Sequence, residues 1–260
     1  MCKTTNELGS VHHNPPLEVI VQSELDTHHI AAAELRTQFP KNSGEATIAV
    51  YFNEEGVELR SAAKPNHKGF KVNFLGIDRR TGAGNLSRKQ PLPKAIGQST
   101  KSVLDLTAGF CSDAFRLSMM GYKVTAFERS PIIAALVEDG IRRAKEDREF
   151  WTEFGARFNF IRGDVLNGHN PEPHEVVYLD PMFPPKRKKS ALPQGSIQVL
   201  KAIVGYDDEV KTMDLFRTAM NTAIKRVVVK RPNHAPLFAK NPAVIYKGKL
   251  VRYEVYKPNN

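Results

Sequence analysis

The sequence has few cysteines and no long hydrophobic run. Its 260 residues include two cysteines, Cys2 and Cys111, too few for a disulfide framework or for a zinc site made of cysteines. No apolar run approaches the roughly 18–20 residues that cross a bilayer, and residues 1–10 lack the apolar stretch of a signal peptide. We therefore expect a cytoplasmic protein with no membrane span.

Residues that bind metals are sparse as well. Adjacent histidines occur twice, as His12-His13 and His28-His29. Side chains of neighbouring residues point in different directions on a helix or a strand, and no carboxylate or cysteine stands at ligand spacing from these pairs. We expect no metal site.

Acidic residues are outnumbered by basic ones. The chain has 38 Lys and Arg against 28 Asp and Glu, a net charge of +10. Such an excess favours nucleic acid or another polyanion as a partner, although general solubility would also explain it. A cluster of four consecutive cations strengthens the nucleic-acid interpretation: Lys186, Arg187, Lys188 and Lys189.

The most informative stretch lies directly before this cluster. An apolar run over 176–179 stops at Asp180-Pro181-Met182-Phe183-Pro184-Pro185, which is typical of a buried strand that delivers a polar loop to the edge of a sheet. The prolines stiffen the loop. It presents a carboxylate, free carbonyl groups and an aromatic ring close together, as a flat amine-bearing ring requires. We expect Asp180, Pro181 and Phe183 to be catalytic, although Phe183 could be a core aromatic residue.

The chain before residue 100 predicts a small α+β extension over 1–80. Its elements are a strand over 17–21, a helix over 24–39, a hairpin of 46–52 and 57–60, and a further strand over 71–75. A loop-like, basic stretch over 78–98 then connects to the next domain. In the predicted division of the chain, residues 81–99 form this connecting segment, between the extension and the domain that begins at residue 100. This segment could be a linker or a lid that orders over a substrate.

Strands and helices alternate over 100–260. The predicted strands cover 103–106, 122–127, 158–161, 176–179 and 226–230, with helices over 114–120, from 131 onward and over 207–224. A hairpin of 244–246 and 251–256 ends the chain. This order predicts a Rossmann-like, doubly wound parallel sheet with an antiparallel hairpin at one edge.

Acids end the first three of these strands. Asp105 begins a loop that contains Gly109 but lacks G-x-G-x-x-G, the glycine spacing that a dinucleotide requires. S-adenosylmethionine carries no phosphate, and its amino group and sulfonium are cationic, so an acid suits it. Glu128 follows Asp105 by about 20 residues and is placed to bind a ribose diol, and Asp164 is placed to contact the adenine amine. Each could be an ordinary exposed acid, but the set predicts an S-adenosylmethionine site.

The stretch from Tyr178 to Lys186 resembles the Asp-Pro-Pro-Tyr type motif of amino-methyltransferases, with Met182 at the second proline position. Together with Lys-Ser-Ala-Leu at 189–192 it is similar to the RsmJ family, which methylates the exocyclic N2 of a guanine in small-subunit ribosomal RNA. The resemblance implies a class I methyltransferase fold and S-adenosyl-L-methionine as cofactor, with S-adenosyl-L-homocysteine as product. It also implies 16S ribosomal RNA or the small subunit as partner, with guanosine 1516 as the family's target.

The resemblance spans about residues 100–257, including 227–232, and is weaker over the N-terminal third. It implies cofactor contacts at Ser112-Asp113, where the family has Arg-Asp, at Glu128-Arg129, at Asp164-Val165 and at Asp180. Ser112 in place of arginine weakens that one correspondence.

An exocyclic amine is a poor nucleophile because its lone pair is delocalised into the ring. Hydrogen bonds from the amine to Asp180 and to the Pro181 carbonyl would favour a tetrahedral nitrogen. Alignment of this nitrogen with the methyl group of the cofactor would supply much of the acceleration. The proton could then leave through Asp180. Phe183 would stack on the base. We expect Lys186–Lys189, Lys230 and Arg231 to contact RNA phosphates, although the first four could be a solvated charged face.

Two other interpretations remain open from the sequence. A related amino-methyltransferase could act on DNA adenine or on a protein glutamine; Asp rather than Asn at position 180 favours guanine by family analogy. A non-catalytic RNA-binding assembly factor could also keep this fold, but the retained acids and Phe183 argue against it.

Overall fold

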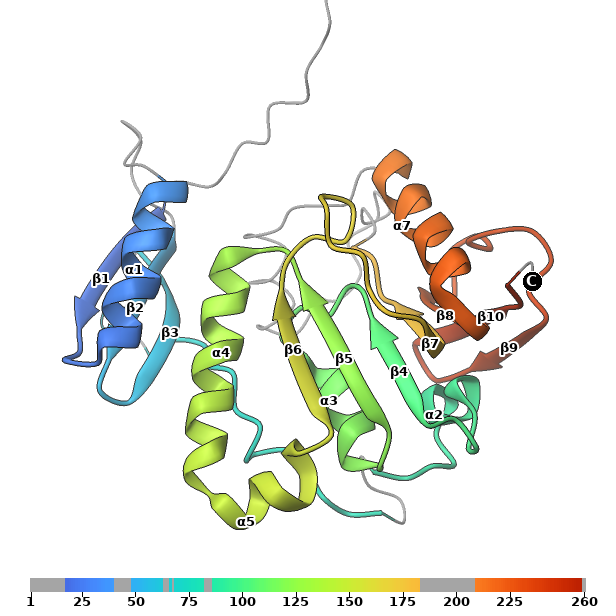
Figure 1. The fold of residues 1–260 in the computed structure, drawn as a ribbon, viewed down its shortest axis with the longest axis horizontal. Helices are drawn as coiled ribbons and strands as arrows, with labels where there is room; N and C mark the ends of the chain where they lie inside the picture. The colour runs from blue at the N-terminus through green and yellow to red at the C-terminus, as the bar shows by residue number, and fades with distance from the viewer. Residues whose placement is uncertain are drawn as a thin grey trace, which may run out of the picture.

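The computed structural model describes residues 17–39, 48–62, 66, 68–81, 86–182 and 209–258. They form two sheets, a three-stranded one of order β1-β2-β3 near the N-terminus and a seven-stranded one of order β6-β5-β4-β7-β8-β10-β9 (Figure 1). Phe183 and Lys186–Lys189 lie outside the described residues. No helix in the described ranges is long and apolar enough to cross a membrane.

The large sheet confirms the predicted doubly wound core. Five strands are parallel: β4 (Ser102–Asp105), β5 (Lys123–Glu128), β6 (Phe158–Arg162), β7 (His174–Leu179) and β8 (Ala223–Pro232). The hairpin of β9 (Val244–Lys247) and β10 (Val251–Tyr256) completes the sheet, and β10 is antiparallel to β8. The strand order reverses between β4 and β7, so ligands are expected beyond the carboxyl ends of these two strands.

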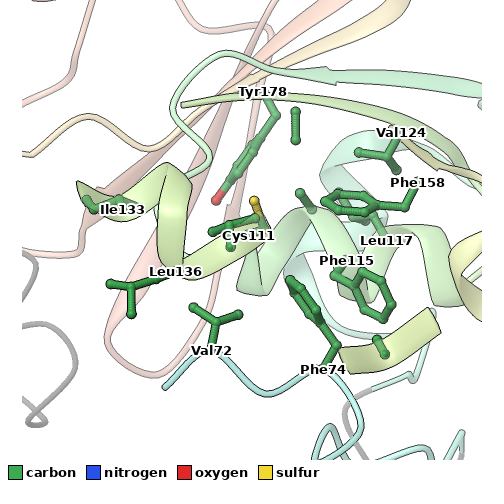
Figure 2. Packing of buried hydrophobic residues seen from close by; sticks show 14 of the residues in the cluster. Val72, Phe74, Cys111, Phe115, Leu117, Val124, Ile133, Leu136, Phe158 and Tyr178 are labelled. Carbon is green, nitrogen blue, oxygen red and sulfur yellow. The ribbon is translucent and has the colours of Figure 1, made fainter. Parts of the chain in front are cut away.

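Helices cover both faces of this sheet because its central strands are apolar on both sides. Val176 and Tyr178 of β7 pack in one buried cluster, whereas Val177 and Leu179 pack in another on the opposite face. The first cluster contains side chains of α2 (Pro91–Ile96), α3 (Ser112–Met119), α4 (Pro131–Glu146), α5 (Arg148–Phe150) and the π-helix η1 (Trp151–Gly155); the second contains α7 (Glu209–Thr222). Figure 2 shows part of the first cluster.

The N-terminal unit consists of β1 (Leu17–Gln22), α1 (Asp26–Gln38), β2 (Ile48–Asn53) and β3 (Gly56–Ser61), in agreement with the predicted strand, helix and hairpin. Asp139 of α4 fastens this unit to the large domain. Its carboxylate, 1% exposed, accepts hydrogen bonds from the Val57 amide at 2.9 Å and from Arg142 and Arg143 at 2.9 and 2.8 Å, and lies 3.4 Å from the imidazole of His28.

Two predicted elements were wrong. Residues 71–75 form no strand: only Phe70 pairs with Leu59 of β3, while Val72 lies on Gly140 of α4 and Phe74 stacks on Phe115 of α3, with ring centroids 4.3 Å apart. The predicted loop over 78–98 contains the helix α2, which begins at Pro91 because proline suits a first helical turn. The division into 1–80, 81–99 and 100–260 stays a prediction.

We predict that Asp139→Asn destabilises the protein by about 2–4 kcal/mol, since it leaves buried donors and two guanidinium groups without a charged acceptor. Its arginines lower the pKa of Asp139 despite its burial. The stabilisation is therefore present at neutral pH and is lost as pH falls through the folded-state pKa. Urea unfolding at neutral and acidic pH measures both effects.

The matched control is Glu146→Gln. Glu146 pairs with the same Arg142 at 2.6 Å but is 64% exposed, so its loss should cost less than about 0.5 kcal/mol. Equal losses for the two variants would contradict the role given to Asp139.

Candidate active site

The carboxyl ends of the parallel strands surround one cavity of about 540 Å³, a size in the range of small-molecule sites. The structure brings together all the predicted site residues that it describes. The cavity is lined by Asp105, Gly109, Ser112, Asp113, Glu128, Arg129, Asp164, Val165, Asp180, Pro181, Lys230 and Arg231. The roles assigned to them from sequence remain predictions.

A tight loop between β4 and α3 forms one wall. The Asp105 carboxylate accepts the Thr107 amide hydrogen at 2.9 Å, and Cys111, which has a left-handed φ of 58°, donates its amide hydrogen to the Ala108 carbonyl at 2.8 Å. Phe110 packs on Phe70 of the N-terminal region, with ring centroids 4.5 Å apart. The N-terminal region therefore supports this loop directly.

The acids of β5 and β6 hold the backbone of their own loops. The Glu128 carboxylate accepts amide hydrogens from Gly109 at 2.8 Å and Ser130 at 2.6 Å, which joins the first two loops of the sheet. The Asp164 carboxylate accepts from the Leu166 amide at 3.0 Å and from the Asn167 side chain at 2.9 Å. These carboxylates thus shape the wall that they line.

An ion cluster lies between this wall and the Asp-Pro loop. The Lys230 ammonium donates to Asp113 at 2.8 Å and to Asp180 at 2.9 Å. Asp113 also accepts from Arg116 at 2.6 Å and from the Tyr178 hydroxyl at 2.9 Å, so both of its oxygens are engaged. Asp180 is 41% exposed and opens onto the cavity, whereas Asp113 is 13% exposed.

The sequence suggests that Lys230 and Arg231 both lie on the rim of the cavity and contact RNA, but the structure places them differently. Lys230 lies among the acids of the cavity. Arg231 is buried, donates to the Pro236 carbonyl at 3.0 Å and lies over the ring of Phe238. The sequence patterns predict no role for Tyr178, Thr107 or Arg116. Only the position of Thr107, two residues after Asp105, marked it as a loop residue of the site.

Burial and like charges shift the pKa values of the acids. Burial, reinforced by Asp113 and Asp180, raises the pKa of Asp105 to about 8. Burial also raises the pKa of Asp180, against the opposing effect of Lys230. Burial would raise that of Asp113, but Lys230 and Arg116 outweigh it and lower the pKa. Asp105 is therefore mostly protonated at neutral pH in the ligand-free protein, and a cationic ligand would favour its ionised form.

The sheet is doubly wound with an antiparallel edge, acids end its parallel strands, and its first loop lacks the glycine spacing that binds a dinucleotide. Together these features define a class I S-adenosylmethionine-dependent methyltransferase. A family model described as "Putative SAM-dependent methyltransferase" matches residues 32–258. The chain belongs to the ribosomal RNA small subunit methyltransferase J family, which the motif at residue 180 resembles. S-adenosylmethionine is the cofactor of this family, as the sequence predicts.

Several relatives of that name span nearly the whole chain. The protein of Marinobacter nauticus is 38% identical over 95% of this chain and 90% of its own length, and that of Buchnera aphidicola is 35% identical over 92% and 93%. A crystal structure of a SAM-dependent methyltransferase from Neisseria gonorrhoeae is 29% identical, with a TM-score of 0.63, and covers 93% of this chain and 97% of its own.

The residues present fit this cofactor. The cavity holds carboxylates for cationic and hydroxyl groups, and its first loop lacks the spacing that binds a pyrophosphate. Within the described ranges, no group of three or more His, Cys, Asp or Glu side chains is arranged to hold a metal ion.

We predict that Asp105→Asn stabilises the ligand-free protein increasingly as pH rises. The folded-state pKa of about 8 lies above an unfolded value of about 3.9. The wild type therefore loses stability as pH rises between these values, by up to about 1.4 kcal/mol per pH unit, because the acid stays protonated in the folded state and ionises on unfolding. Asparagine has no such loss and can still accept from the Thr107 amide. Urea unfolding of both proteins at pH 6, 7 and 8 measures the difference, and a difference that does not change with pH would contradict the assignment.

Proposed function

We propose that the protein transfers a methyl group from S-adenosyl-L-methionine to the exocyclic N2 of a guanine in 16S ribosomal RNA, the family's target being guanosine 1516. The observation that carries the proposal is the placement of Asp180. Its carboxylate opens onto the cavity at the end of β7, next to the first cofactor loop of β4, and the Thr107 hydroxyl accepts its amide hydrogen at 2.6 Å. The names of the relatives supply the ribosomal substrate.

The strand-end acids are proposed to hold the cofactor. Asp105 faces its cationic amino acid portion, Glu128 its ribose diol and Asp164 its adenine, with Gly109 allowing a close approach of the backbone. Ser112, Asp113, Arg129 and Val165 complete the wall. When bound, S-adenosylmethionine supplies an activated methyl group on a sulfonium, so no metal is needed.

Asp180 and Pro181 are proposed to hold the attacking amine. The carboxylate and the proline carbonyl accept its N–H groups, which orients the nitrogen lone pair and favours a tetrahedral geometry. Lys230 fixes one carboxylate oxygen and opposes the rise in the pKa of Asp180 that burial causes. Asp180 therefore keeps acceptor character and can take the proton that the amine loses.

The RNA is proposed to meet the protein at the mouth of this cavity. A base must leave its stack to reach a recessed carboxylate, and Phe183 is proposed to stack on it. The cations Lys186–Lys189 follow this loop directly in the sequence, and the net charge of +10 suits a polyanion. Binding should weaken as salt is raised.

We predict that Asp180→Ala lowers methyl transfer at least about 100-fold, the size of a lost acid–base or positioning group. Binding of S-adenosylhomocysteine should change less than about tenfold, because Lys230 keeps its ion pair with Asp113 and the fold is retained. The assay uses labelled S-adenosylmethionine and small ribosomal subunits that lack the modification, with the product nucleoside identified by mass.

Glu172→Ala, which removes an exposed acid just before β7, is the control and should keep activity within about twofold. Methylation of DNA adenine or of a protein amide in place of guanine would overturn the substrate. RNA binding without cofactor binding would favour a non-catalytic assembly factor.

A further inference from the structure

We propose that Asp180 and Lys230 together recognise the Watson–Crick edge of guanine, so that Lys230 determines which base is methylated. The inference rests on the proposed function and deepens it. The sequence alone suggests that Lys230 contacts RNA phosphates, whereas the geometry of the cavity points to a contact with the base.

The edge of guanine has a fixed order of polar groups. It presents an acceptor at O6, a donor at N1–H and a donor at the N2 amine. Its complement is one N–H donor followed by two acceptor oxygens, which an ammonium beside a carboxylate provides. Adenine has an amine where guanine has O6 and a bare acceptor at N1, so the same pair of side chains would meet it with mismatched groups.

Lys230 and Asp180 are spaced as this complement requires. The ammonium lies 2.9 Å from one oxygen of Asp180, so a base that faces the carboxylate with N1 and N2 brings O6 to the ammonium. Both side chains are accessible from the cavity, Lys230 by 23% and Asp180 by 41%.

Each of the two groups keeps unused hydrogen-bonding capacity. An ammonium has three N–H donors, and two of them are directed at Asp113 and Asp180. Among the described residues, no acceptor takes the third N–H, and no donor reaches the second carboxylate oxygen, Oδ1 of Asp180. A guanine edge would satisfy both.

The fold holds the pair in this position. Strand β8 lies parallel to β7 with Leu179 opposite Val229, so Asp180, just after β7, and Lys230, within β8, lie side by side. Asp113 holds the ammonium from α3 and is itself held by Arg116 and the Tyr178 hydroxyl. Lys230 is therefore oriented before any base arrives, and specificity benefits from such preorganisation.

The experiment measures the choice between bases that all keep the 2-amino group. Small subunits are reconstituted with 16S RNA that carries guanine, 2-aminopurine or 2,6-diaminopurine at the target position. 2-Aminopurine lacks O6, 2,6-diaminopurine replaces it with an amine, and both have a bare acceptor at N1. For the wild type we expect kcat/KM for guanine to exceed that for either analogue by about 100-fold or more.

Two variants change this ratio in predicted ways. Lys230→Met should reduce the preference for guanine over 2-aminopurine at least about tenfold, because the donor to O6 is lost. The double variant Lys230→Met with Asp180→Asn should shift the preference toward both analogues, since without the ammonium the amide is free to donate to a bare N1 and still accept from the 2-amino group. Lys230→Arg retains a donor and should keep much of the preference.

Lys225→Met is the matched control. Lys225 lies on the same strand at its other end, in an exposed pair with Glu175 at 3.0 Å, and its loss should leave the ratio unchanged. Thermal unfolding and binding of S-adenosylhomocysteine confirm that each variant is folded. If Lys230→Met does not fold, Lys230→Gln, whose amide can still donate to Asp113, takes its place in both variants, and the same changes in the kcat/KM ratio are expected.

The outcomes separate the two proposals. If Lys230→Met lowers transfer to all three bases by the same factor, Lys230 only holds Asp180, and base recognition is overturned while the proposed function stands. If the double variant Lys230→Met with Asp180→Asn keeps the wild-type ratio, base recognition by the carboxylate is overturned. If the wild type does not methylate guanine in these subunits, the proposed function fails, and the inference fails with it.

Discussion

The ammonium of Lys230, held between the carboxylates of Asp113 and Asp180, is the interaction on which the active site depends. It joins three elements that are distant in the sequence: helix α3, the Asp-Pro loop after β7, and strand β8. Three carboxylates approach one another here: Asp113 and Asp180 raise the pKa of Asp105, and Asp113 raises that of Asp180. Lys230, together with Arg116, lowers the pKa of Asp113, and it also binds one oxygen of Asp180. The order β4-β7-β8 in the sheet makes this arrangement possible.

The convergence of the strand-end acids could be predicted from sequence, but the pairing of Lys230 could not. Asp105, Glu128 and Asp180 each follow an apolar strand, and parallel topology alone brings such positions to one edge. Which acid a lysine meets depends on the order of the strands, which no local pattern contains. The alternation of side chains along a strand does separate Lys230 from Arg231: Val228 and Val229 pack on opposite faces, and the two cations follow the same alternation.

The N-terminal third shows a second limit of sequence patterns. Residues 71–75 alternate as a strand would, and Val72 and Phe74 are indeed buried. Alternation shows that one side of an extended segment is covered, but not whether a strand or a helix covers it. Here helices α3 and α4 do so, and Phe70 continues this contact to Phe110 in the loop between β4 and α3. The N-terminal unit and this loop are therefore parts of one packed structure, and Asp139 anchors the N-terminal unit to α4.

The electrostatics of the cavity favour a cationic ligand independently of any glycine motif. Asp105, Asp113 and Asp180 lie close enough to interact, while Lys230 bonds to only two of them. The ligand-free protein limits their repulsion by keeping a proton on Asp105, whose pKa is about 8. A ligand with positive charge can take the place of that proton, and its attraction to the carboxylate then contributes to binding. A phosphate-bearing ligand would add to the repulsion and would require further protons or cations. The charges of the cavity therefore favour a cationic ligand such as S-adenosylmethionine over one that carries phosphates.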